Sequence, residues 1–245
     1  MSLDVMGRLP RSRVARVTGG FYLAFIVASV LADVLGHIGI GPVGQVYQAI
    51  TLHVGSFRLG LVVALISAFL FVMAAWGLYV LLRSVDESLA LLFLVLNAVG
   101  VAIQCASVLS LLSAMSLGDG ASRMQVYSAA ELEGLAYLFI GTYKTGFVTA
   151  QLFFGTWLFP LGYLVYRSRS LPRLLGVLLM VDGVAVLIWF LQALLLPAHP
   201  EITYPGLVVS FVAEVGLALW LLVRGVKVVD SVAGPAGGRA RSRSA

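Results

Sequence analysis

The chain has 245 residues, of which 60% are hydrophobic and only 11% are charged, and its mean hydropathy is +1.02. A soluble domain usually carries about 25% charged residues, and much of its surface must face water. This composition excludes an ordinary soluble enzyme or binding domain and indicates a membrane protein. The net charge of +5 does not require a nucleic-acid partner, because membrane topology accounts for where the basic residues lie.

Six apolar segments are each long enough to cross a membrane as a helix. About 18 or more apolar residues in a row indicate a span, because at 1.5 Å per residue a helix of about 20 residues crosses about 30 Å of hydrocarbon. The segments cover residues 17–35, 59–82, 89–112, 145–166, 174–196 and 205–223. We therefore predict an all-α fold, a polytopic membrane protein built as a bundle of six transmembrane helices.

The basic residues predict the orientation of this bundle. With six spans, both ends of the chain lie on one side of the membrane, and 13 of the 16 Lys and Arg residues fall on that side. Cytoplasmic loops are enriched in Lys and Arg, so we expect a multi-pass plasma-membrane protein with cytoplasmic N- and C-termini. The expected organisation is a basic cytoplasmic N-terminus (1–16), a six-helix transmembrane domain (17–227) and a disordered basic cytoplasmic tail (228–245).

Two carboxylates interrupt the last two spans at the same expected depth. Glu214 lies ten residues before Arg224, which places it about 15 Å from the cytoplasmic face. Asp182 lies ten residues after Pro172, at about the same depth. A charged side chain at the bilayer centre costs about 2.5–3.5 kcal/mol on insertion scales, so both are expected to face the protein interior. A pair of carboxylates joins helices poorly but is typical of proton-coupled carriers and cation sites.

Other polar residues recur on single faces of their predicted helices. At 100° per residue, polar positions align on one face of five spans, whereas the second span is almost wholly apolar. The simplest arrangement points the five faces inward, around a polar cavity that opens to the outside. Alternatively, these side chains only join helices through hydrogen bonds worth about 0.6 kcal/mol each. Beside Glu214 and Asp182, the candidate ligand- or ion-binding residues are Asn97, Gln104, Gln151, Trp189, Gln192 and Ser210.

Three further charges are expected near the outer mouth of this cavity. Asp33, Arg58 and Lys144 all fall in the outer half of the predicted membrane region. Because a charge in this environment needs a partner, we expect at least one salt bridge among them. An attraction for an anionic ligand is the alternative role for the two basic side chains.

Three stretches of the chain follow a known sequence pattern. They are GFVTAQLFFGTWLFPLGYLVYRSRSLPRLLGVLLMVDGVAVLI (Gly146–Ile188), AEVGLALWLLVRG (Ala213–Gly225) and SFRLG (Ser56–Gly60). They resemble the DUF4386 family of uncharacterised bacterial membrane proteins, over about residues 13–227. Where the family often has SGFLPR, this chain has SRSLPR, which adds a cytoplasmic arginine. The resemblance implies a multi-span integral membrane protein and brings no established activity, cofactor or catalytic residue.

The sequence leaves three functions open. The first is binding or transport of a small molecule or cation through an outward-opening polar cavity with midplane carboxylates. The second is a non-catalytic membrane sensor or scaffold with a dry, hydrogen-bonded core, and the third is a lipid- or quinone-modifying enzyme with a cleft open laterally to lipid. The chain shows no pattern for a catalytic residue, a metal site or a cofactor. The expected partners are the lipid bilayer and a small-molecule or cation ligand, without nucleic acid, while the oligomeric state stays open.

Overall fold

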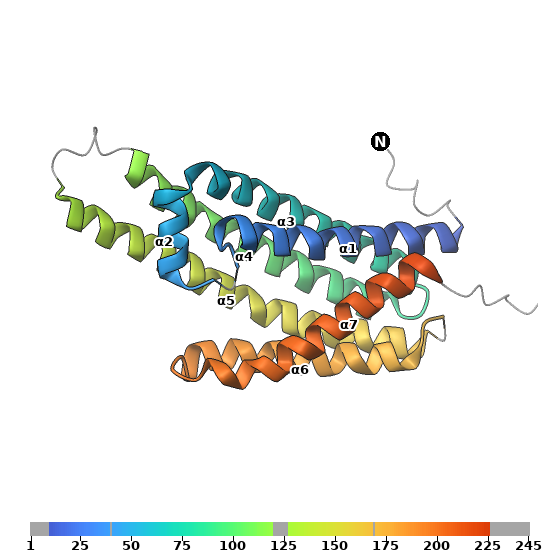
Figure 1. Ribbon diagram of the computed structural model, residues 1–245. Helices are drawn as coiled ribbons and strands as arrows, with labels where there is room; N and C mark the ends of the chain where they lie inside the picture. The colour runs from blue at the N-terminus through green and yellow to red at the C-terminus, as the bar shows by residue number, and fades with distance from the viewer. Residues whose placement is uncertain (1–9, 40, 120–126, 169, 226–245) are drawn as a thin grey trace, which may run out of the picture.

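The computed structural model describes residues 10–39, 41–119, 127–168 and 170–225, which form helices and no strand (Figure 1). The helices are α1 (Arg11–Gly36), α2 (Val43–Leu52), α3 (Val54–Leu82), α4 (Glu87–Asp119), α5 (Ala129–Arg167), α6 (Arg173–Leu195), the 3₁₀ turn η2 (Pro200–Thr203) and α7 (Tyr204–Val223). Most of the expected N-terminal segment (1–16) and the whole expected tail (228–245) lie outside the described residues.

Six helices of the described chain are long and apolar enough to cross a membrane, which confirms the predicted six-span bundle. The largest difference lies in α5, which begins at Ala129 rather than near residue 145. A capping box starts this helix, because the Ser128 hydroxyl accepts from the Glu131 amide while the Glu131 carboxylate accepts from the Ser128 amide. The cap satisfies backbone donors that a helix start otherwise leaves unpaired, so the helix extends well before its apolar part.

The connection between the first two spans contains α2, which the sequence analysis did not predict. Val46, Ala49 and Ile50 are its buried residues, and their spacing of three and four puts them on one face. This face packs against α3, α4 and α5, and the helix lies across the bundle toward the end that is remote from the start of α1 and the end of α7 (Figure 1).

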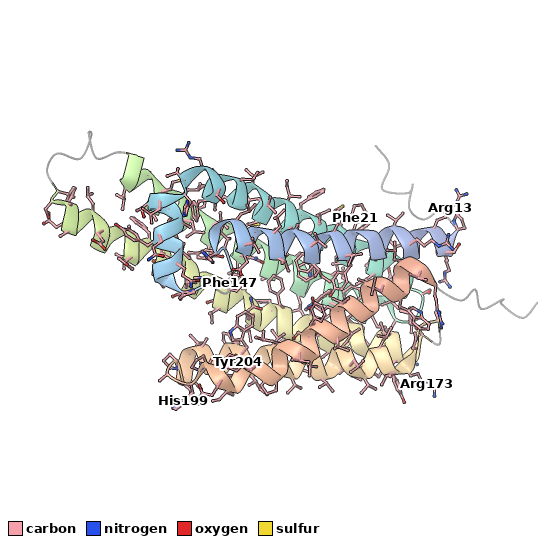
Figure 2. All side chains as sticks on the ribbon, in the orientation of Figure 1. Arg13, Phe21, Phe147, Arg173, His199 and Tyr204 are labelled. Carbon is pink, nitrogen blue, oxygen red and sulfur yellow. The ribbon has the colours of Figure 1, made fainter. Side chains whose placement is uncertain are left out.

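The six long helices form a closed ring in the order α1, α3, α4, α5, α6, α7 and back to α1, each packed mainly against its two ring neighbours. Basic side chains gather at the end of the ring where α1 begins and α7 ends. Figure 2 shows Arg13 and Arg173 at this end, whereas His199 and Tyr204 lie at the opposite end of α6 and α7.

Two apolar clusters fill the ring, one toward each end. The larger cluster, toward the termini, includes Phe71, Trp157 and Leu217. The smaller cluster, toward α2, includes Phe57 and Tyr143. Outside the ring, many large apolar side chains are exposed, as expected of helices that face lipid.

Candidate functional site

A cavity of about 520 Å³ lies inside the ring and reaches Glu214. Its walls come from all six long helices and from the segment that precedes α2. Its polar lining residues are Ser29, Asp33, Ser67, Gln104, Gln151, Ser210 and Glu214. Glu214 is half-buried because its side chain faces this space, in the middle of α7. The carboxylate in this apolar span therefore faces a cavity rather than packed side chains.

Asp182 lies directly behind the cavity wall. It is fully buried, and its Oδ1 accepts a hydrogen bond from the hydroxyl of Ser210, one of the lining residues. Its Oδ2 has no hydrogen-bond partner within the described part of the chain. Asp182 and Glu214 lie close enough to influence each other electrostatically, so α6 and α7 bring the two predicted carboxylates together.

Tyr22 lies near this acidic pair and comes from α1, the ring neighbour of α7. Its side chain is fully buried, and its hydroxyl has no hydrogen-bond partner among the residues described. It lies within electrostatic range of both Glu214 and Asp182. Unpaired polar groups are costly in a low-dielectric interior, so a ligand or water that supplied partners here would be bound favourably.

The remaining cavity walls are largely aromatic. Phe71 is at their centre, stacked on Phe25 at a centroid distance of 4.1 Å and edge-on to Trp157 at 5.2 Å. Nearby, Phe147 and Trp189 contact each other at 6.0 Å. All five of these rings line the cavity. Of these five rings, only Trp189 was predicted as a site residue. The prediction was based on the positions of polar residues, and an aromatic residue gives no polar signal.

The three predicted outer charges lie in different surroundings, and only Asp33 lines the cavity. Lys144 Nζ donates to the carbonyl oxygen of Gly39 at 2.7 Å and lies over the Tyr143 ring. Asp33 lines the cavity, and its buried Oδ1 has no hydrogen-bond partner within the described segments. Asp33 influences Lys144 electrostatically, but the ion pairs of the described residues do not include one between them. Arg58 is exposed in the first turns of α3, outside the cavity lining.

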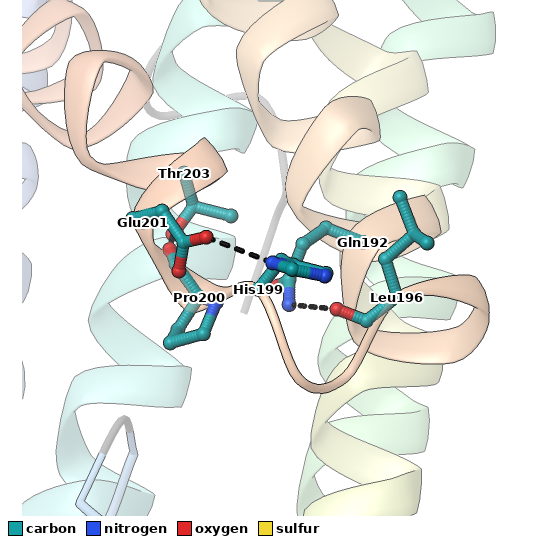
Figure 3. A network of polar contacts seen from close by, with 6 residues as sticks. All are labelled: Gln192, Leu196, His199, Pro200, Glu201 and Thr203. Carbon is teal, nitrogen blue, oxygen red and sulfur yellow. Dashed lines mark hydrogen bonds and ion pairs between the residues drawn. The ribbon is translucent and has the colours of Figure 1, made fainter.

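Two predicted polar residues lie away from the cavity. Asn97 is fully buried, and neither its Oδ1 nor its Nδ2 has a partner among the described residues. Gln192 donates from Nε2 to the carbonyl oxygen of Leu196 at 2.8 Å and so closes the end of α6 (Figure 3). Next to it, His199 Nδ1 lies 2.9 Å from Glu201 Oε1 (Figure 3). Both contacts lie at the connection between α6 and α7.

A metal site requires several ligand side chains close together. The described residues contain no group of three or more His, Cys, Asp and Glu side chains that could hold a metal ion.

Six long apolar helices around an acidic and aromatic cavity define a polytopic helical membrane protein. The chain belongs to the DUF4386 family, described as "Domain of unknown function (DUF4386)", which matches residues 17–225 and confirms the resemblance seen in the sequence. It is also similar to an "Uncharacterized protein" of Archaeoglobus fulgidus, with 33% identity over 89 residues. The match covers 34% of this chain and 49% of the archaeal protein, so the chain spans about half the length of the curated relative it matches. No solved structure matches the chain.

Proposed function

We propose that this protein binds or transports a small molecule or cation in the cavity, with Glu214 as the principal polar contact. The observation that carries this proposal is a cavity of about 520 Å³ that reaches a carboxylate in the middle of a membrane-spanning helix. Small-molecule sites usually measure about 300–1,000 Å³ and combine apolar walls with a few convergent polar groups. An ionisable residue inside a membrane segment is itself a marker of a functional site.

The proposed site includes the predicted residues that line the cavity: Glu214, Ser210, Gln104, Gln151 and Trp189. Asp182 acts indirectly, because it holds the Ser210 hydroxyl from behind the wall. Asn97 and Gln192 are left out of the site, since they do not line the cavity.

The cavity weighs against a sensor or scaffold, and the side chains that line it, rather than its shape, weigh against an enzyme. A sensor or scaffold was expected to have a dry, fully hydrogen-bonded core, and an empty space beside unpaired Asp182 and Tyr22 atoms does not fit that expectation. A lipid- or quinone-modifying enzyme needs a nucleophile or base beside an orienting group. The described lining offers the carboxylates of Asp33 and Glu214, which can serve as bases, but no histidine, cysteine or lysine to act with them, so binding is the function that these side chains support best.

The orientation that we propose places both termini in the cytoplasm of a plasma-membrane protein, because the basic residues gather at the terminal end of the bundle. Reporter fusions after Ser84 should give a cytoplasmic signal, and fusions within residues 36–56 should give an external one. The opposite pattern at both positions would invert the orientation, and an external signal at both would contradict the six-span arrangement.

The proposed function predicts ligands whose binding depends on Glu214. A small-molecule library screened by thermal unfolding of the purified protein should contain compounds that stabilise it, by about 2.7 kcal/mol at a concentration of 100 Kd. Replacing Glu214 by Leu should remove this stabilisation, because Glu214 is the lining carboxylate in the middle of a membrane-spanning helix and the principal polar contact proposed here. Replacing Glu133 by Leu is the matched control, since this glutamate is exposed and outside the lining. A screen in which every stabilising compound acts equally on the Glu214→Leu variant would refute the proposal.

A further inference from the structure

We propose that the ligand of this cavity is a lipophilic cation that enters from the bilayer through the gap between α1 and α7. This inference rests on the proposed binding function and adds the chemistry of the ligand and its route. The route follows from where the cavity opens, and the chemistry follows from the groups that line it.

Helices α1 and α7 touch closely only toward the terminal end of the bundle. At Gly19, an added Cβ atom would lie 2.6 Å from the Leu222 nitrogen and 2.7 Å from the Ala218 oxygen, so only glycine permits this contact. From this crossing the two helices diverge toward the other end of the bundle (Figure 1). The gap between them therefore widens at the level of the cavity.

The exposed residues of the lining show that the cavity opens into this gap. Val30 and Val34 of α1 are 59% and 70% exposed, and Leu207 and Phe211 of α7 are 42% and 65% exposed. The lining residues that come from α3, α4, α5 and α6 are all buried or half-buried. The opening is thus lateral, in contrast to the outward opening that the polar stripes suggested.

The rim of this opening lies within the apolar part of the membrane region. Leu207 and Phe211 precede Arg224 by 17 and 13 residues, or about 25 and 20 Å at the rise of a helix, inside the about 30 Å of hydrocarbon. The exposed residues beside the rim, Val27 and Val208, are apolar too. A rim of this kind contacts acyl chains, so a molecule that passes it must first dissolve in lipid.

The interior of the cavity favours positive charge. The described lining carries the carboxylates of Asp33 and Glu214 and no lysine or arginine, and Asp182 adds a third carboxylate behind Ser210. Lys144 is turned to the Gly39 carbonyl and is not part of the lining. Phe71 and Trp189 also line the cavity, and aromatic rings attract cations as well as apolar groups. An apolar body with one positive charge fits both features.

A pair of probes with the same shape and opposite charge tests the chemistry. Tetraphenylphosphonium should bind the protein in lipid nanodiscs, whereas tetraphenylborate and the hydrophilic cation tetramethylammonium should bind at least about tenfold more weakly. Replacing Glu214 by Gln should weaken tetraphenylphosphonium binding about tenfold or more, while Glu133→Gln should not change it. Equal or tighter binding of tetraphenylborate would overturn the charge assignment, and tighter binding of tetramethylammonium would overturn the lipophilic one.

The route is tested by two equally exposed valines of α1. Val30 and Val27 are both 59% exposed, but only Val30 lines the cavity. Val30→Trp should slow the association of tetraphenylphosphonium at least about tenfold by narrowing the gap, and Val27→Trp should leave the rate unchanged. Equal rates in the two variants would overturn the lateral route. If the library screen yields Glu214-dependent ligands but none is a lipophilic cation, this inference fails while the proposed function stands.

Discussion

Replacing Gly176 by leucine should prevent α5 and α6 from packing and should lower the free energy of unfolding by at least about 3 kcal/mol. An added Cβ atom at Gly176 would lie 2.6 Å from the Gly162 oxygen and 2.6 Å from the Tyr166 nitrogen. Both atoms belong to the backbone of α5, so no side-chain rotation can make room. Reversible unfolding of the purified protein in detergent, followed by tryptophan fluorescence, measures the loss.

The contact is reciprocal, which makes the effect specific to this helix pair. An added Cβ atom at Gly162 would lie 2.7 Å from the Gly176 oxygen, and one heptad away Gly155 and Gly183 approach each other in the same manner. Gly141, also in α5, has nothing within 4 Å of an added Cβ atom. Gly141→Leu should therefore change stability by less than about 0.5 kcal/mol. Equal losses in Gly176→Leu and Gly141→Leu would contradict this packing.

Hydropathy predicted the spans because the length of an apolar run is set by the thickness of the bilayer, whatever the neighbours of a helix are. It could not predict the ring order, which depends on contacts such as those of Gly155 and Gly183. Hydropathy did not predict α2 either, because only Val46, Ala49 and Ile50 are buried in this short helix. Three apolar positions are too few to give a recognisable pattern among polar and glycine-rich neighbours. The start of α5 was missed because exposed capping residues, Ser128 and Glu131, specify it rather than an apolar run.

The cavity lining was predictable to the extent that polarity inside a span is informative. Glu214, Ser210 and Gln151 lie on the cavity wall because a polar group in hydrocarbon must face the interior. The same signal cannot tell a cavity from a packed interface, and it also selected Gln192, which caps its own helix. The aromatic walls of the cavity could not be predicted from the sequence, because an aromatic residue in a membrane helix can face lipid, the packed core or a cavity.

Asn97 is a buried polar residue that does not line the cavity, so its replacement tests what such a side chain contributes to packing. Replacing it by leucine, which has nearly the same shape, should raise the free energy of unfolding by about 1–3 kcal/mol. Both polar atoms of its amide are buried without a partner in the described chain, so the apolar substitute removes an uncompensated cost. Asn97→Ala should stabilise less or not at all, because it leaves an empty volume.

Gln192 is the matched control for this substitution. Its amide donates to the Leu196 carbonyl, so Gln192→Leu should lower the free energy of unfolding by about 1 kcal/mol, in the opposite direction to Asn97→Leu. Both variants are compared by the same reversible unfolding measurement in detergent. A loss of stability in Asn97→Leu would mean that the Asn97 amide has a hydrogen-bond partner in the membrane, such as a bound water. Water inside the ring would then extend beyond the cavity that Glu214 lines.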